Sequence, residues 1–348
     1  MKASSPHRLC LVARIPGVAG PASFQRRLAE ALQRRGIGVS YGLDDLPYQA
    51  VLVIGGTRRL AALWRARRRG VPIVQRLNGI NWIHRVRRTG LLHFVRAELN
   101  NAVLRLIRDR MADRVVYQSE FARAWWERRY GPPPVPSTVV YNGVPLGLFR
   151  PEGDADRPSD HARLLVVEGN LAGGYEVGLE WAVALARRLQ EKHALKVELA
   201  VAGRVSEGLK EAWRGRQGVD LHWLGLVPPE AIPALDRSAH LLFAADLHPA
   251  CPNAVLEALA CGLPTIAFAT GALPEIIVGD AGRLVPYGGD PWRVDPPDIA
   301  GLAEAAREVL KDQPRFRAGA RARAEAAFGL DAMAHGYLAA LGWEGIAV

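Results

Sequence analysis

The strongest constraint on the fold is a regular alternation of short apolar runs with longer amphipathic stretches, repeated in two rounds along the chain. Strand candidates lie at residues 9–15, 39–43, 50–56, 71–77, 113–119 and 137–143 in the first round, and at 163–169, 195–203, 218–225, 240–246, 262–269 and 282–287 in the second. The stretches between them carry apolar residues at helical spacing. Because strands that alternate with helices form parallel sheets, the sequence predicts two doubly wound α/β domains.

A polar segment separates the two rounds. Residues 151–162, PEGDADRPSDHA, are nearly devoid of large apolar side chains and predict a linker. A chain of 348 residues also exceeds what one hydrophobic core usually supports. We therefore predict one Rossmann-like domain over residues 1–150 and a second over 163–328.

Charge is divided unevenly between the two rounds. Residues 1–150 hold 26 Lys and Arg against 8 Asp and Glu, a net charge of +18, and the remainder has a net charge of −8. An anionic partner of the first half, such as membrane lipid or a phosphorylated acceptor, would explain the asymmetry, and so would general use of Arg at solvated positions. No DNA- or RNA-binding signature accompanies the charge, so we expect no nucleic-acid partner.

Other sequence features exclude several classes of protein. Neither the GxGxxG spacing of dinucleotide-binding sites nor a P-loop is present, which disfavours a nicotinamide or flavin oxidoreductase. The three cysteines, Cys10, Cys251 and Cys261, form no CxxC pair and predict neither disulfides nor a zinc site. With no long apolar run and no signal peptide, the chain is expected to be cytoplasmic, and the inner face of the membrane stays open as an alternative.

One segment of the second round, HPACPNAVLEALACGLP, predicts a ligand site. Pro252 suits a first helical turn, and the helix would begin at the carboxyl edge of a parallel sheet, where open α/β folds bind ligands. Free amides of Asn253, Ala254 and Val255, together with the helix dipole, would bind a diphosphate. Glu257 lies one turn further and could accept two hydrogen bonds from a ribose diol.

The next strand candidate ends in a glycine-containing turn, residues 270–275. Gly271 would let the backbone approach a ligand closely, and the amides of Ala272 and Leu273 could meet sugar hydroxyls. Taken alone, the turn is also what an ordinary connection punctuated by Gly and Pro looks like.

Taken together, residues 251–277, CPNAVLEALACGLPTIAFATGALPEII, closely resemble the donor-site segment of GT-B glycosyltransferases of family 4, the retaining group 1 enzymes. The loop IPGVAGPASF, which contains Gly17 and Gly20, and the later segments VVYNGVPLGLF and GRLVP match other marks of that family in the same order. The resemblance implies two Rossmann-like domains facing each other across a cleft, with C-terminal helices, including one over 329–348, packing back toward the first domain. It further implies that the second domain binds a nucleoside diphosphate sugar, with Gly17 and Gly20 contributing, and that the first binds a hydroxyl acceptor.

Three positions depart from the pattern of that family. The first Glu of its E-x7-E motif falls on Pro249, and a basic pair expected near the diphosphate falls in GNLAGGYEVG, residues 169–178, which contains no Lys or Arg. Many relatives have a His near the sugar where this chain has Asn78. A charge-assisted contact to a phosphate is worth about 1.5–3 kcal/mol, so the loss of both basic residues would need replacement.

Nearby polar residues are candidates to replace the missing contacts. Arg204 ends a strand at the same sheet edge and could restore one charge, although a solvated loop position is the alternative; Arg76 is a second candidate. His248, or Asp246, could contact the sugar or the leaving phosphate. We predict His248, Arg204 and Asn78 as the catalytic group.

These features predict a retaining, metal-independent glycosyltransferase that moves a sugar from a nucleoside diphosphate sugar to a hydroxyl acceptor without a cofactor. Asp154 and Asp156 form a DxD, a metal-binding signature of another glycosyltransferase fold, but they lie in the polar linker and predict no metal site. The acceptor is left open between a lipid-linked molecule and a precursor of polysaccharide or cell envelope. Residues 82–111 read either as a basic amphipathic surface for anionic lipid or as a core helix with an exposed Arg face. The alternative function is a non-catalytic relative that keeps the fold for binding or scaffolding.

Overall fold

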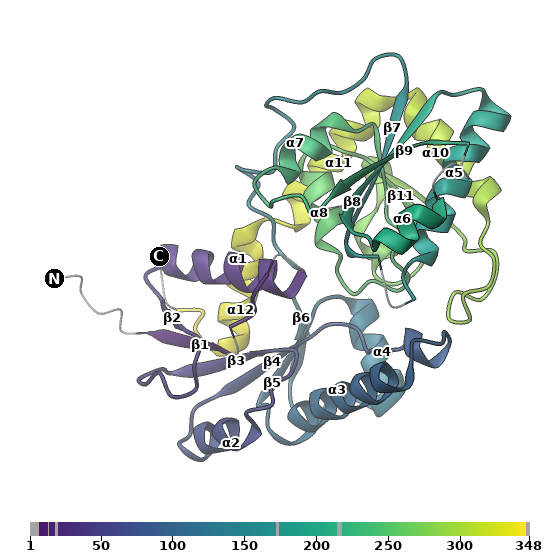
Figure 1. The fold of residues 1–348 in the computed structure, drawn as a ribbon. Coiled ribbons are helices and arrows are strands. Elements are labelled where there is room, and N and C mark those ends of the chain that lie inside the picture. The colour runs from purple at the N-terminus through teal and green to yellow at the C-terminus, as the bar shows by residue number, and fades with distance from the viewer. Residues whose placement is uncertain (1–6, 13, 18–19, 172–173, 214–217, 346–348) are drawn as a thin grey trace. The chain divides into compact units, whose positions relative to one another are not determined.

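The structure is a computed structural model and describes residues 7–12, 14–17, 20–171, 174–213 and 218–345. Within these ranges the strands form two six-stranded sheets in which every neighbouring pair is parallel (Figure 1). The chain divides into two compact units. Unit 1 comprises Met1–Trp82, Gly90–Gly143 and Gly329–Val348, and unit 2 comprises Ile83–Thr89 and Val144–Phe328.

The sheet of unit 1 has the strand order β2-β1-β3-β4-β5-β6. Its strands are β1 (Arg8–Val12), β2 (Gly38–Ser40), β3 (Ala50–Ile54), β4 (Ile73–Leu77), β5 (Arg114–Tyr117) and β6 (Ser137–Val139). The β1, β3 and β4 strands are almost entirely buried, as expected for a sheet with helices on both faces.

Alternate residues of these strands enter two separate cores in unit 1. Leu9 and Leu52 pack with α1 (Gly20–Arg34) and α12 (Leu330–Leu341), whereas Cys10 and Val51 pack with α2 (Leu60–Arg68) and α3 (Leu91–Arg110). Side chains that alternate across a strand explain why both faces need a helical cover. The remaining helix of this unit, α4 (Glu120–Tyr130), begins at a Ser119 cap whose hydroxyl accepts a hydrogen bond from the Ala122 amide at 3.1 Å.

The sheet of unit 2 has the strand order β12-β11-β10-β7-β8-β9. Its strands are β7 (Ala162–Asn170), β8 (Val197–Arg204), β9 (Asp220–Gly225), β10 (Leu241–Phe243), β11 (Thr265–Phe268) and β12 (Gly282–Val285). The chain runs outward from β7 through β8 to β9, and then returns to β10 on the other side of β7. The boundary between β7 and β10 is therefore the switch point of the sheet.

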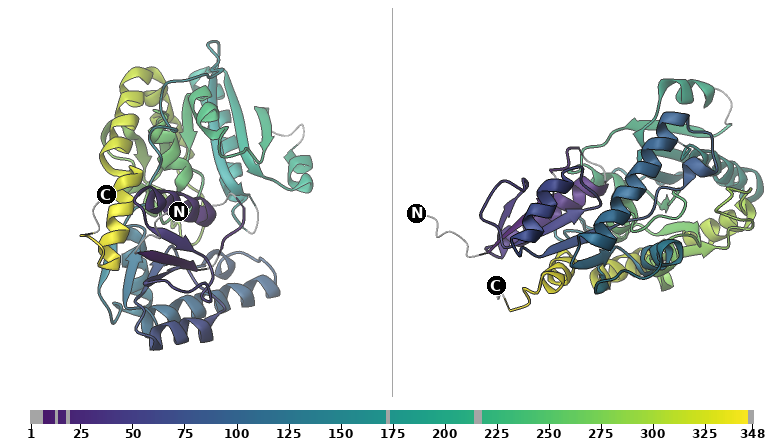
Figure 2. Two further views of the ribbon diagram at one scale, coloured as in Figure 1. Left: turned by 90° about the vertical axis from the view of Figure 1, so that its left-hand side faces the viewer. Right: turned by 90° about the horizontal axis from the view of Figure 1, so that it is seen from below.

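Helices also cover the sheet of unit 2, as Figures 1 and 2 show. The longer ones are α5 (Val177–His193), α8 (Asn253–Ala260), α10 (Ile299–Lys311) and α11 (Gln313–Ala327), and the short ones are η1 (Ile83–Arg85), α6 (Glu207–Trp213), α7 (Ile232–Ser238), α9 (Leu273–Ile276) and η2 (Gly279–Ala281). α5 packs against α10, and α8 packs against α7 and α11. These contacts leave the beginnings of α5 and α8 at the carboxyl ends of the strands that precede them.

The predicted alternation of strands and helices is confirmed, because each of the strand candidates in both rounds overlaps a strand of the structure. No helix in the described ranges is both long and apolar enough to cross a membrane.

Candidate functional site

Two carboxyl groups lie at the switch point of unit 2. Glu168 is near the carboxyl end of β7, and Asp246 follows the neighbouring strand β10. The Oδ1 atom of Asp246 is buried and accepts no hydrogen bond from the residues that the structure describes. Burial raises the pKa of Asp246 to about 7, and burial followed by the charge of Asp246 raises the pKa of Glu168 well above its ordinary value. Both carboxyl groups therefore keep a proton to higher pH than exposed carboxyl groups do.

The start of α5 comes close to the same edge. A Cβ atom added to Gly178 would lie 2.8 Å from the Cβ and carbonyl oxygen of Ala245, so α5 meets the residue just before Asp246 without space for a side chain. Burial and then the charges of Asp246 and Glu168 raise the pKa of Tyr175, which places its phenol beside the carboxyl pair. The positive end of the helix dipole of α5 and the two carboxyl groups thus meet at the switch point.

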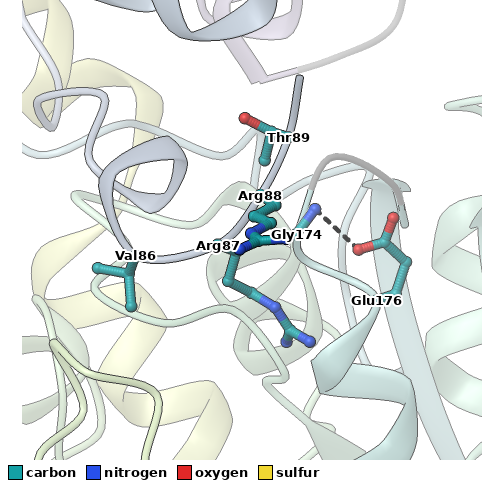
Figure 3. Close-up of a pocket in the computed structure, with 6 residues that line it drawn as sticks. All are labelled: Val86, Arg87, Arg88, Thr89, Gly174 and Glu176. Carbon is teal, nitrogen blue, oxygen red and sulfur yellow. Dashed lines mark hydrogen bonds between the residues drawn. The ribbon is translucent and has the colours of Figure 1, made fainter. Parts of the chain in front are cut away.

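A pocket of about 680 Å³ opens in unit 2 between two segments of the chain (Figure 3). It is lined by Val86, Arg87, Arg88, Thr89, Gly174 and Glu176. Its volume is in the range of small-ligand sites. The Glu176 carboxylate accepts a hydrogen bond from the Gly174 amide at 2.8 Å, which fixes the loop just before α5.

The second helix start of this edge belongs to α8, as the sequence predicts. Asn253 and Ala254 are half-buried at its first turn, and the Ala254 amide donates no hydrogen bond to other described residues. The Val255 amide instead donates to the Pro252 carbonyl at 3.2 Å, so the prediction of a free amide at Val255 is wrong. Asn253 and Ala254 stand at the start of α8 as predicted, and their binding of a diphosphate stays a prediction.

Glu257 lies one turn into α8 and is 9% exposed. Its carboxylate faces α7: burial and then the negative charge of Glu257 raise the pKa of Asp236, whose Oδ2 is buried and accepts no hydrogen bond in the described structure. Asp236 accepts a hydrogen bond from the Cys261 thiol. Glu257 therefore lies near the buried carboxyl group of Asp236 on α7.

The turn after β11 packs against another part of the protein. A Cβ atom on Gly271 would lie 2.5 Å from Cδ of Pro249, and the Ala272 amide donates to the Pro249 carbonyl at 2.8 Å. The Leu273 amide donates to the Thr270 carbonyl at 3.2 Å. The prediction that these two amides and Gly271 receive a sugar is therefore corrected: glycine is needed here because the chain before α8 packs against the turn.

His248 is also packed inside unit 2. Its ring stacks on Trp292 with centroids 3.6 Å apart and an interplanar angle of 12°. Only 6% of the residue is exposed, and burial lowers the pKa of His248 to about 4, so the imidazole is neutral at pH 7. The predicted catalytic contact from His248 is replaced in this structure by a packing role under the indole.

Arg204 and Arg76, the two arginines predicted to replace the missing basic pair, lie in different surroundings from each other. Arg204 is exposed at the end of β8 and makes no ion pair with any described residue, so it stays a candidate. Arg76 in unit 1 is 2% exposed, donates to Asn142 Oδ1 at 3.0 Å and lies 3.8 Å above the Phe24 ring, which commits its charge to the core of that unit.

Three predicted residues belong to unit 1. Asn78 follows β4, is half-buried, and its carbonyl accepts a hydrogen bond from Trp126 Nε1 at 2.7 Å. Gly17 has a φ of +93° with open space where a Cβ would stand, and Gly20 is the first residue of α1.

Of the 169–178 segment, residues 172 and 173 lie outside the described ranges.

Sequence reasoning did not single out Arg87 and Arg88 for the site. The dibasic Arg87-Arg88 stands far from the Gly-rich loop in sequence, and only the fold brings it beside Gly174. No group of three His, Cys, Asp or Glu side chains that could hold a metal ion occurs in the described part of the chain.

Two family models match the chain. The model described as "Glycosyl transferases group 1" matches residues 162–312, and the one described as "Glycosyltransferase Family 4" matches residues 43–148. The first match contains every element of unit 2 from β7 to α10, including both helix starts of the candidate site.

Individual proteins match either a short part of the chain or nearly all of it at low sequence identity. O-antigen chain mannosyltransferase B of Escherichia coli is 30% identical over 123 residues, which are 35% of this chain and 28% of that relative's own length. Sucrose-phosphate synthase from Thermosynechococcus elongatus has a TM-score of 0.72 at 18% identity and covers 95% of this chain and 97% of its own. Anabaena HepE in complex with UDP-glucose has a TM-score of 0.71 at 16% identity and covers 96% and 99%. At these sequence identities the structural similarity shows a shared fold and nothing further.

The raised pKa of Asp246 makes the stability of the protein depend on pH. Because the folded-state pKa of Asp246, about 7, lies above its ordinary value of 3.8, its contribution to stability is complete below about pH 4 and is lost as pH rises through 7. We expect Asp246→Asn to raise the free energy of unfolding at pH 8 by about 1–3 kcal/mol and to change it much less at pH 5. Denaturant unfolding at both values, with exposed Asp154→Asn as the matched control, measures this; an equal effect at both pH values would contradict it.

Proposed function

Because the chain belongs to the family 4 (group 1) glycosyltransferases of GT-B fold, we propose that it transfers a sugar from a nucleoside diphosphate sugar to a hydroxyl acceptor with retention of configuration. The observation that carries the proposal is the start of α8. Asn253 and Ala254 stand at the carboxyl edge of the sheet, and Glu257 lies one turn behind them, within a segment that the group 1 family model matches. Helix amides suit phosphate oxygens, and a carboxylate suits a ribose diol.

Relatives and structural neighbours support the class of donor. HepE is described with bound UDP-glucose, and the Escherichia coli relative is named a mannosyltransferase. The matched segment spans 28% of that mannosyltransferase, so the sugar is left open in our proposal.

The chemistry follows from where charge develops. As the sugar leaves, the diphosphate gains negative charge, which the amides and dipoles at the starts of α5 and α8 would stabilise. The acceptor oxygen would then bond to the anomeric carbon on the face that the diphosphate leaves, and the hydroxyl proton would pass to the departing diphosphate. His248 cannot supply positive charge at pH 7, because its pKa is lowered to about 4.

Unit 1 presents an exposed apolar surface at the beginning of α3. Leu91, Leu92 and Leu99 are 78%, 88% and 62% exposed, and residues 1–150 carry a net charge of +18. We propose that this surface rests on an anionic membrane, which would bring a lipid-linked acceptor to the enzyme. Replacing Leu91 and Leu92 by Ser should reduce co-sedimentation with anionic vesicles at least about fivefold, a loss expected for about 1 kcal/mol or more of lost apolar burial. Equal sedimentation of both proteins would rule out this surface.

Removal of the Glu257 carboxylate tests the donor site. We expect Glu257→Ala to raise the Kd of the best-binding nucleoside diphosphate, chosen among UDP, GDP and ADP, by about 10- to 100-fold, since a hydrogen bond to a charged group is worth about 1.5–3 kcal/mol. Isothermal titration calorimetry measures the Kd, and exposed Glu191→Ala on α5 is the matched control.

Glu257→Gln separates binding from folding, because it keeps the volume of the side chain beside α7. A folded Glu257→Gln protein with weakened nucleotide binding supports the assignment. Wild-type affinity in both variants would contradict it, and a wild-type protein that binds none of the three nucleotides would favour the non-catalytic alternative.

A further inference from the structure

The loop before α5 is rich in glycine and contains no positive side chain, yet it lies where a diphosphate would meet the switch point of unit 2. Gly174 has a φ of +105°, and a Cβ there would lie 3.1 Å from Cγ1 of Ile83 and 3.7 Å from Cδ of Arg87. The segment Ile83–Thr89 therefore packs directly against this loop. Any other residue at 174 would be strained and would push the two segments apart.

Two arginines of that segment line the pocket beside the loop. Figure 3 shows the side chains of Arg87 and Arg88 next to Gly174, with the Glu176 carboxylate turned to the Gly174 amide. Both arginines are exposed, and the side chain of neither forms an ion pair or a hydrogen bond with any residue that the structure describes. The pocket thus holds two uncommitted guanidinium groups against one carboxylate that is already used by the loop.

A guanidinium with all its donors open is suited to phosphate. Its planar fork can donate two hydrogen bonds to one phosphate group, and it stays charged at any physiological pH. The 17-residue helix α5 begins directly behind Glu176, so its dipole adds positive potential at the same place.

We propose that Arg87 and Arg88 bind the diphosphate of the nucleotide sugar and so replace the basic pair that the loop of residues 169–178 lacks. This inference rests on the proposed function. In this proposal the segment Ile83–Thr89 supplies the positive side chains of the donor site, which the loop before α5 lacks.

The charge of the surrounding edge is compatible with an anion. Glu168 and Asp246 would repel a diphosphate if both were ionised, but burial raises the pKa of each. Tyr175 beside them is neutral. A raised pKa means that these carboxyl groups carry less negative charge at a given pH, which lowers the repulsion that an anionic ligand meets at this edge.

The test is nucleotide binding by Arg87→Gln/Arg88→Gln. We expect the double variant to raise the Kd of the nucleoside diphosphate by about 10- to 100-fold at pH 7 and moderate salt, with no change in the Kd of the matching nucleoside, which has no phosphate. Arg87→Lys/Arg88→Lys keeps the charges but not the planar forks and should recover only part of the affinity. Arg65→Gln/Arg68→Gln on exposed positions of α2 removes the same total charge and should change the Kd less than twofold.

The outcomes separate the two proposals. If the wild-type protein and the Arg87→Gln/Arg88→Gln variant bind the nucleotide equally, the inference is overturned while the proposed function stands. If the control on α2 weakens binding as much as the pocket variant, long-range charge explains the loss and the inference is again overturned. If Glu257→Ala and the wild-type protein alike bind no nucleotide, the proposed function fails and the inference fails with it.

Discussion

The parallel pairing of every strand in the two sheets decides where chemistry can happen in this protein. Parallel strands need a crossover after each strand, so all carboxyl ends of one sheet gather at one edge, together with the starts of the following helices. In unit 2 that edge holds the end of β7, the residues after β10, and the beginnings of α5 and α8. Glycine at 178 allows α5 to approach Ala245, and glycine at 271 allows the turn after β11 to approach Pro249. Glycine at these two positions therefore permits the close packing that a parallel sheet requires at this edge.

The sequence predicts the elements well and the side-chain contacts of the site only in part. Hydrophobic runs and helical periodicity depend on near neighbours in the chain, so the strands of both sheets and the start of α8 could be predicted from the sequence. The roles of His248, Ala272 and Leu273 could not, because stacking on Trp292 and hydrogen bonding to Pro249 depend on contacts across loops. A motif gives the position of a residue in the chain, and packing decides whether its polar atoms are still available.

Pro249 is the clearest example of this difference. The sequence shows only that a carboxylate of the family pattern is missing there. In the structure the proline carbonyl accepts the Ala272 amide, and its ring fills the space beside Gly271. The chain at Pro249 thus packs against the turn after β11, and the position of the missing carboxylate is held by a residue that accepts a backbone hydrogen bond from this turn.

The central claim is that the edge of unit 2 holds the donor nucleotide. A crystal structure of the protein with a bound nucleoside diphosphate measures this most directly. The account predicts the ribose hydroxyls within hydrogen-bonding distance of the Glu257 carboxylate and the phosphates between the starts of α5 and α8. A nucleotide bound with its ribose remote from Glu257, or bound only to residues of unit 1, would contradict it.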